Sequence, residues 1–319
     1  MRLIFAGTPE TAVPSLRALI DSDHEVVAVL TRPDAPTGRG RRLTPSPVRV
    51  AAEQAGIEVL TPATLRDETI QDRLRVLAPD AIPVVAYGAL VPPAALDIPA
   101  HGWINLHFSL LPQWRGAAPA QRAVLAGQER TGMTTFRIAE GLDTGDVLLR
   151  ETATIGATAT AGELLERLAD DGAALLVRTL DAIADGSATL TPQDDAHATH
   201  APKLTPAEAR IDWARPAAEV SAHIRGMSPH PGAWTLYDGE RFKVLGVEDA
   251  AAPEDLALAP GEIGATRKHL FVGTATTPLA LGTVGPPGKR AMRATDWARG
   301  AKPVEGAAFI AETRTEEAR

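Results

Sequence analysis

The chain of 319 residues contains no cysteine. This absence excludes disulfide bonds, thiolate metal sites and a cysteine nucleophile. The sequence also lacks an apolar run of about 18 residues, the minimum for a membrane-spanning helix. The apolar run at residues 3–6 is too short for a signal peptide. We therefore expect a cytoplasmic protein that does not insert into membranes.

The first strand-to-helix turn lacks the glycine-rich fingerprint of dinucleotide-binding proteins. Residues 3–6 have the apolar pattern of a buried strand, and Gly7 is the only glycine in the turn that follows. Dinucleotide binding uses several closely spaced glycines at this position, because the backbone must approach the pyrophosphate. The sequence therefore does not support a nicotinamide cofactor.

The sequence has no overall excess of positive charge, since its formal net charge at pH 7 is -8. Nucleic-acid binding depends on Lys and Arg, but a local basic patch is sufficient. Arg39, Arg41 and Arg42 form one such cluster in the Pro- and Gly-rich segment 31–48, and residues 289–293 hold another. Long loops inside compact domains are usually functional. Each cluster taken alone is better explained as solvated surface charge.

Strand and helix patterns alternate in the first part of the chain. Apolar strand patterns at residues 3–6 and 25–30 enclose a helical pattern, as in a β-α-β unit of a parallel sheet. Short strands with Gly and Pro turns dominate the last part, which is typical of a small β-barrel or sandwich. We predict an α/β fold with a mostly parallel N-terminal domain at 1–188, a linker at 189–206 and a smaller β domain at 207–319.

Local signals indicate where single elements begin or turn. We expect Thr8 to cap the first helix. Thr160 and Glu163 match a capping box at the start of a later helix. The dipeptide at residues 238–239, Asp-Gly, lies between two extended runs and predicts a hairpin.

Residues 103–116 form the stretch with the most chemical content. Apolar side chains alternate there with an amide, an imidazole and a hydroxyl, in the order Ile104, Asn105, Leu106, His107, Phe108, Ser109. Successive side chains of a strand point to opposite faces, so the polar groups share one face. Pro112 then ends the strand, because proline cannot donate to a ladder. The pattern indicates either a reaction site or a half-buried edge strand with one wet face.

Asn105, His107 and Asp143 are the residues we expect to carry chemistry. A carboxylate near a histidine fixes its tautomer and supports its charged form. An amide beside it can donate to a developing oxyanion. No nucleophile elbow surrounds Ser109. Direct transfer to a nucleophile brought by the substrate therefore fits better than a covalent enzyme intermediate.

We expect no metal site. His197 and His200 lie in the predicted linker, and their spacing is compatible with a pair of metal ligands. Histidines in linkers are mostly surface groups, and we interpret these two in that way.

Several longer motifs make the sequence similar to a known family. They are Asn-Leu-His-Phe-Ser-Leu-Leu-Pro at 105–112, Arg-Gly-Ala-Ala-Pro at 115–119 and Gly-Leu-Asp-Thr-Gly-Asp at 141–146. The chain resembles the folate-dependent formyltransferases in these motifs. The first turn at 5–9, the arginine-bearing loop at 32–48 and the segments at 201–204 and 208–213 resemble the branch of the family that formylates methionyl-tRNA.

The resemblance implies a function and an architecture. The implied reaction transfers the formyl group of 10-formyltetrahydrofolate to the α-amino group of methionine on initiator tRNA, for translation initiation. The implied fold has a Rossmann-like catalytic domain and a C-terminal β-barrel domain of OB type that helps to hold the tRNA. We expect a monomer without a metal.

The resemblance also assigns roles to residues. The family's catalytic residues match Asn105, His107 and Asp143. Asn105 and His107 would stabilise the tetrahedral oxyanion, and Asp143 would support the charged form of His107. The positions that match the family's folate contacts are Tyr87, Gly88, Ser109, Leu110, Leu111 and Pro112. The positions that match its tRNA contacts are Arg39, Arg41 and Arg42.

Three other functions remain open from the sequence. A related formyltransferase could act on a small amine, such as glycinamide ribonucleotide or an amino sugar nucleotide, with the same catalytic set. A hydrolase could release formate from the same folate. A non-catalytic RNA-binding protein could retain the fold, although the intact set of Asn105, His107 and Asp143 argues against it.

Overall fold

The computed structural model describes residues 1–37 and 42–310. The chain divides into two compact units. The N-terminal unit comprises Met1–Pro119, Thr131–Ala153 and Leu165–Ala201, and the C-terminal unit comprises Ala120–Arg130, Thr154–Leu164 and Pro202–Arg319. The predicted boundaries at 188 and 207 stay predictions.

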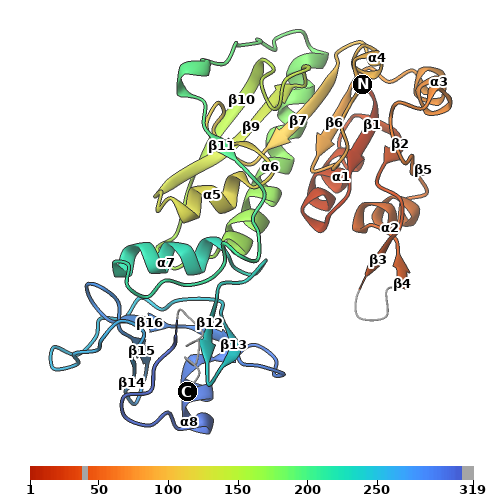
Figure 1. The fold of residues 1–319 in the computed structure, drawn as a ribbon. Helices are drawn as coiled ribbons and strands as arrows, with labels where there is room; N and C mark the ends of the chain where they lie inside the picture. The colour runs from red at the N-terminus through yellow and green to blue at the C-terminus, as the bar shows by residue number, and fades with distance from the viewer. Residues whose placement is uncertain (38–41, 311–319) are drawn as a thin grey trace, which may run out of the picture. The chain divides into compact units, whose positions relative to one another are not determined.

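A seven-stranded sheet of order β10-β9-β7-β6-β1-β2-β5 forms the centre of the N-terminal unit (Figure 1). Its strands are β1 (Arg2–Gly7), β2 (Glu25–Leu30), β5 (Glu58–Leu60), β6 (Ile82–Val85), β7 (Trp103–His107), β9 (Arg130–Arg137) and β10 (Val147–Thr154). β1 pairs in parallel with β2 and β6, β2 with β5, and β6 with β7, whereas β9 is antiparallel to β7. Parallel strands need crossover helices, which cover the sheet. The α/β prediction with a mostly parallel sheet is confirmed.

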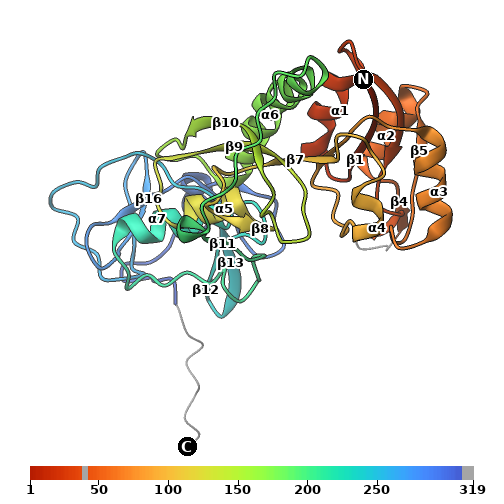
Figure 2. The same ribbon diagram turned by 90° about the horizontal axis from the view of Figure 1, so that it is seen from above.

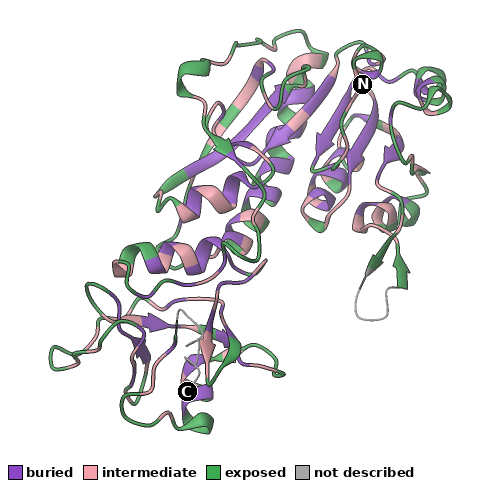
Figure 3. Cartoon of the chain, in the orientation of Figure 1, coloured by how far each residue is buried: buried purple, intermediate pink, exposed green. Residues whose placement is uncertain are grey.

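Helices connect and cover these strands. They are α1 (Val13–Ile20), α2 (Pro47–Gln54), α3 (Glu68–Leu77), α4 (Pro93–Leu96) and α6 (Ala161–Ala184), with short 3-10 helices at η1 (Glu10–Ala12) and η2 (Asp195–His197). Strand residues at the centre of the sheet are buried on both faces (Figure 3). The predicted capping box at the start of α6 is confirmed, since the Glu163 N–H donates to Thr160 Oγ1 and the Thr160 N–H donates to Glu163 Oε2.

Strand β7 lies inside the sheet between β6 and β9, so the interpretation of an edge strand is wrong. One of its faces packs on α6, which lies on the same side of the sheet as α1 (Figure 2). Leu106 fills the space above Gly172 of α6, where a Cβ atom would approach its side chain to 2.8 Å. Because neighbours alternate, Asn105 and His107 point to the other face. The predicted separation of faces therefore holds for residues 104–107, where the strand ends, and the helix occupies the apolar face.

The segment after β2 forms a two-stranded arm rather than an unpaired loop. Strand β3 (Ala35–Thr37) pairs antiparallel with β4 (Arg42–Thr44). The expected cap at Thr8 is wrong. The first helical turn begins after Pro9 with no side-chain cap, and the Thr8 hydroxyl instead donates to the Tyr87 carbonyl at 2.8 Å. This hydrogen bond joins two neighbouring strand ends, a tertiary contact that a local helix-start pattern does not contain.

The C-terminal unit is built on antiparallel strands. Two sheets have the orders β12-β13-β17-β18 and β14-β15-β16. Their strands are β12 (Trp234–Tyr237), β13 (Glu240–Val244), β14 (Ile263–Ala265), β15 (Leu270–Val272), β16 (Leu279–Leu281), β17 (Thr283–Gly285) and β18 (Met292–Arg293). The unit also contains α7 (Ala217–Gly226), α8 (Ala294–Ala301) and most of α5 (Pro119–Leu125). The predicted hairpin at 238–239 is confirmed between β12 and β13, where both turn residues have positive φ.

A core of aromatic and aliphatic side chains holds this unit together. Phe242 lies at its centre. The centroid of its ring is 4.8 Å from that of Trp297 and 5.0 Å from that of Phe309. Such ring contacts add to the free energy gained by burying apolar surface. Among the residues that the structure describes, no helix combines the length and apolar character needed to cross a bilayer.

Candidate active site

The carboxyl end of β7 presents two of the predicted catalytic side chains on one face of the sheet. The backbone of Asn105 is fixed on both sides by pairing with Val84 and Phe136. In the described part of the chain, the side-chain amide of Asn105 has no protein hydrogen-bond partner, and it is partly exposed. A rigid backbone with an uncommitted amide is suited to donate a hydrogen bond to a ligand.

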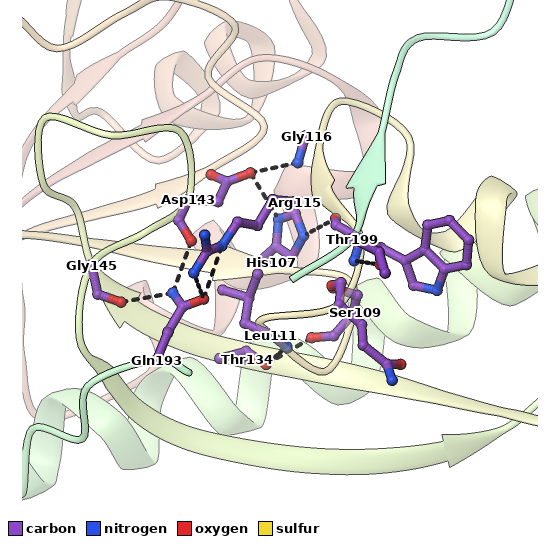
Figure 4. Close-up of polar contacts among 12 residues, drawn as sticks. His107, Ser109, Leu111, Arg115, Gly116, Thr134, Asp143, Gly145, Gln193 and Thr199 are labelled. Carbon is purple, nitrogen blue, oxygen red and sulfur yellow. Dashed lines mark hydrogen bonds and ion pairs between the residues drawn. The ribbon is translucent and has the colours of Figure 1, made fainter. Parts of the chain in front are cut away.

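His107 is held by a carbonyl on one side and faces a carboxylate on the other (Figure 4). Its side chain is 6% exposed, and its Nε2 lies 2.9 Å from the Trp114 carbonyl oxygen. A carbonyl only accepts, so Nε2 carries the hydrogen. In the neutral ring the lone pair is therefore on Nδ1, which lies 3.8 Å from Asp143 Oδ2. This distance is too long for a direct hydrogen bond, but it is short enough to stabilise a proton on Nδ1.

Burial lowers the pKa of His107 from its usual value, because the charged ring loses its hydration. The Asp143 carboxylate and the Trp114 carbonyl act in the opposite direction. Burial is the largest contribution, so the resting ring is neutral near pH 7. The site thus contains a base that becomes an acid after it takes up one proton.

Asp143 is placed by its backbone as much as by its side chain. Its Oδ2 accepts a hydrogen bond of 2.8 Å from the Gly116 N–H, which orients the carboxylate. Its φ is 52°, in the left-handed region that Asp tolerates better than most residues. Two residues further on, a Cβ atom at Gly145 would lie 1.7 Å from the Arg137 carbonyl oxygen, so this position requires glycine.

The loop that follows β7 is fixed by hydrogen bonds from its own hydroxyl groups and from β9. Ser109 is fully buried and lies outside the strand, where its hydroxyl donates to the Gln113 carbonyl at 2.6 Å. Thr134 Oγ1 donates to the Ser109 carbonyl and accepts from the Leu111 N–H. Leu111 packs in a small cluster with Phe136 and Val147. Of the predicted folate-contacting residues here, Leu110 and Pro112 are partly exposed, whereas Ser109 and Leu111 are buried.

The other predicted folate residues follow β6. Tyr87 is 2% exposed, and burial raises the pKa of its phenol to about 12. Gly88 is exposed and has a φ of 79°. The Thr8 hydroxyl bonds to the Tyr87 carbonyl, so the strand ends of β1 and β6 are tied together. The carboxyl ends of adjacent parallel strands are the usual ligand-binding edge of such sheets.

Of the predicted tRNA-contacting arginines, the structure describes Arg42, which lies on the β3–β4 arm. Arg42 is exposed at the start of β4, opposite Thr37. Arg39 and Arg41 lie outside the described residues. The structure therefore places Arg42 away from any buried ion pair, and it gives no position for the other two.

Sequence reasoning missed a set of residues in the segment that it interprets as a linker. Residues 191–201 bond back to the N-terminal unit, through Thr191 to Val147 and through β11 (His200–Ala201) to β8 (Arg115–Gly116). Gln193 bonds to the backbone around Asp143, and Thr199 accepts a hydrogen bond from the Trp114 N–H. This segment has no period and no apolar run, so only the three-dimensional structure identifies its contacts.

The two histidines of the predicted linker lie in η2 and β11. His197 Nδ1 lies 2.9 Å from Asp194 Oδ2, and both side chains are largely exposed. Among the described residues, no cluster of three or more His, Asp or Glu side chains could hold a metal ion.

Comparisons with known proteins agree in both parts of the chain. The family model described as Formyl transferase matches residues 1–180, and the model described as Formyl transferase, C-terminal domain, matches residues 203–302. The methionyl-tRNA formyltransferase of Thermobifida fusca is 57% identical over 97% of this chain and 99% of its own length. That of Streptomyces coelicolor is 56% identical over 96% of this chain and 98% of its own length.

A solved structure with low sequence identity shares the fold. It is an N-formyltransferase from Helicobacter canadensis in complex with folinic acid and dTDP-3-aminofucose. The TM-score is 0.67 at 16% identity, and the match covers 88% of this chain and 97% of that chain. From the matched family models and the close relatives, we conclude that this chain belongs to the formyl transferase family.

Proposed function

We propose that the protein transfers a formyl group from a folate donor to the α-amino group of methionyl-tRNA. The observation that carries the chemistry is the buried His107, with Nδ1 directed toward Asp143 at 3.8 Å and the uncommitted amide of Asn105 on the same strand face. The acceptor is supported by the relatives named methionyl-tRNA formyltransferase, which match nearly the whole chain.

Asn105 stabilises the oxyanion of the tetrahedral intermediate. The neutral amine attacks the formyl carbon, and the carbonyl oxygen gains negative charge as the new C–N bond forms. The Asn105 amide is carried by an interior strand whose backbone is paired on both sides, which limits the movement of the donor. One such donor is typically worth about 3 kcal/mol of transition-state stabilisation.

His107 moves the proton that the reaction must transfer. Its Nδ1 accepts the proton that the attacking amine loses, and the same proton then goes to the folate nitrogen as the old C–N bond breaks. Asp143 stabilises the imidazolium between these two steps, because its carboxylate faces Nδ1. While charged, His107 also helps Asn105 to stabilise the oxyanion. No net proton is gained or lost by the enzyme.

We propose 10-formyltetrahydrofolate as the donor. Its binding edge would be formed by the strand end at Tyr87 and Gly88 and by the loop 109–112. This proposal is supported by a fold shared with an N-formyltransferase that was solved with folinic acid. Because Ser109 and Leu111 are buried, they would shape the loop, while Leu110 and Pro112 would face the folate.

The basic groups that we propose for tRNA are in two places. The first is the sequence cluster of Arg39, Arg41 and Arg42. The second is a pocket of about 300 Å³ in the C-terminal unit, whose lining residues include Arg267, Lys268, His269, Arg293 and Arg299. Clusters of this kind attract phosphates even when the net charge of the protein is negative. We also propose that the protein acts as a cytoplasmic monomer.

The experiment that tests the proposal compares acceptors. The purified protein is incubated with 10-formyltetrahydrofolate and, in parallel reactions, with methionyl initiator tRNA, glycinamide ribonucleotide, an amino sugar nucleotide or buffer. We expect formyl-methionine on the tRNA and little product elsewhere. Product on a small amine alone, or formate released at the same rate without an acceptor, would contradict the proposed acceptor.

A further inference from the structure

The side chain of Gln193 joins two segments that meet at Asp143 (Figure 4). Its Nε2 donates to the carbonyl oxygens of Asp143 and Gly145, each at 2.8 Å. Its Oε1 accepts from Arg115 Nε at 3.1 Å and from Arg115 Nη2 at 2.8 Å. All four hydrogen-bonding positions of the amide are therefore used. Carbonyls only accept and a guanidinium only donates, so the Gln193 amide can have only this orientation.

These hydrogen bonds close a ring around the proposed catalytic carboxylate. Arg115 is 5% exposed, and the next residue, Gly116, donates its N–H to Asp143 Oδ2. Asp143 is thus held by its backbone carbonyl through Gln193 and by its carboxylate through Gly116. Arg115 links these two attachments, because it bonds to Gln193 and precedes Gly116 in the chain.

The backbone of Asp143 needs this support. Its left-handed φ of 52° is a sparsely populated conformation for a residue other than glycine. A chain freed from Gln193 would relax toward commoner φ values and turn the carboxylate away from His107. Displacements of about 1 Å in a catalytic group can cost about a hundredfold in rate.

We propose that Gln193 is a positioning residue for formyl transfer, which sets the distance and direction of the Asp143 carboxylate relative to His107 Nδ1. This inference rests on the role of Asp143 proposed above. The hydrogen bonds of the Gln193 side chain go to Arg115, Asp143 and Gly145 and not to His107, so its effect passes through the segment 143–145 and through Arg115 and Gly116.

Two substitutions remove the hydrogen bonds in different ways. Gln193→Glu keeps the size and the contact with Arg115, but it removes both donors and places a carboxylate oxygen against two carbonyls. Gln193→Met keeps the approximate length and removes all four hydrogen bonds. Asp194→Asn is the matched control, because Asp194 is the exposed neighbour of Gln193 and bonds to His197 and the Ala196 N–H.

We expect both Gln193 variants to lower kcat at least about tenfold, with little change in KM for tRNA. We also expect the limb of the kcat/KM pH profile that reports His107 to move to lower pH, because the supporting carboxylate is displaced. Asp194→Asn should match the wild type in all three quantities. Circular dichroism and thermal unfolding verify that each variant is folded.

A double-mutant cycle separates positioning from other roles. In the Asp143→Asn background, Gln193→Glu should cause less than a threefold further loss, because there is no carboxylate left to place. An equal loss in both backgrounds, or an unchanged pH profile in folded Gln193→Met, would overturn the inference. Wild-type activity in Asp143→Asn alone would instead contradict the proposed role of Asp143. This result therefore distinguishes a failure of that role from a failure of the inference about Gln193.

Discussion

His107 combines deep burial with two polar neighbours of different kinds, a carbonyl at Nε2 and a carboxylate near Nδ1. Burial favours the neutral ring, and the carboxylate favours the charged one. This balance is useful for a group that must hold a proton only during the reaction. The same balance has consequences for stability as well as for catalysis.

We predict that His107 makes the folded protein less stable in mild acid. Its pKa is lowered in the folded state, so the unfolded chain binds the proton more readily. The stabilisation is complete above the unfolded pKa of about 6.5 and is lost as the pH falls through the lower folded value. Urea unfolding of the wild type and of His107→Gln, at pH values from about 4.5 to about 8, measures this contribution.

The pKa values of His24 and His223 are also lowered, mainly by burial, and these residues contribute to the same acid limb. The informative quantity is therefore the difference in unfolding free energy between the wild type and the variant. We expect that difference to shrink as the pH falls below about 6.5. A difference that is independent of pH would show that His107 has an ordinary pKa.

Asn105 is the residue whose loss should affect the transition state most selectively. We predict that Asn105→Ala lowers kcat by about 10²- to 10³-fold, because an oxyanion donor is removed. KM for both substrates should change little. Steady-state formylation of methionyl-tRNA provides these values. An equal drop in affinity for the folate would instead assign the amide to ground-state binding.

At the level of single elements, residues 138–145 connect β9 to the site. The chain leaves β9 at Arg137, passes through the left-handed Asp143 and returns at Gly145, next to the Arg137 carbonyl. The geometry of Asp143 therefore depends on the close approach of two backbones. Such approaches are possible only for glycine.

We predict that Gly145→Ala lowers activity at least about tenfold, since a displacement of about 1 Å in a catalytic group is costly. The added Cβ would lie 1.7 Å from the Arg137 carbonyl oxygen, so the segment must move. Gly300→Ala is the control, because nothing lies within 4 Å of a Cβ there. Full activity in folded Gly145→Ala would mean that the placement of Asp143 tolerates this shift.

The sequence predicts those parts of the site that follow from strand geometry. Alternation along residues 103–107 places Asn105 and His107 on one face, and the structure has α6 on the other. The strand ends earlier than the alternation suggests, so Ser109 is a buried loop residue that bonds to Gln113. Alternation in sequence does not reveal where tertiary contacts end a ladder.

Contacts between distant segments could not be predicted. Gln193 lies 50 positions from Asp143 in the chain, in a segment without a period. The Thr8 hydroxyl has the local pattern of a helix cap, yet it bonds to Tyr87, 79 positions away. In both cases a polar side chain satisfies a backbone group that becomes its neighbour only when the sheet assembles. Local propensity gives no signal for such pairs.

At the scale of the whole molecule, a net charge of -8 has to be reconciled with a polyanionic substrate. Binding to phosphates depends on local clusters rather than on the total. The arginine cluster that includes Arg42, at the start of β4, and the pocket lined by Arg267 and Lys268 are the clusters we propose. The remaining acidic surface would then oppose binding in other orientations.

We predict that Arg41→Ala with Arg42→Ala weakens tRNA binding and lowers its dependence on salt, by about one unit of slope for each phosphate that the protein no longer neutralises. The pair Arg267→Ala and Lys268→Ala should behave in the same way. Filter binding of methionyl-tRNA from about 50 to 200 mM salt measures both slopes. Arg17→Ala, at an exposed arginine on α1, serves as the control. An unchanged slope would mean that the cluster is ordinary surface charge that does not neutralise tRNA phosphates.

The proposed chemistry is tested most directly by single-turnover formylation of methionyl-tRNA, with enzyme in excess and 10-formyltetrahydrofolate saturating, in the wild type and in Asp143→Asn. Asn keeps the shape of Asp143 and removes the charge that faces His107. We predict rapid formation of formyl-methionyl-tRNA by the wild type. In the variant we predict a rate lower by about a hundredfold or more, with unchanged tRNA affinity. Equal rates in the two proteins, or weaker tRNA binding without a change in rate, would contradict the role of Asp143 in proton transfer.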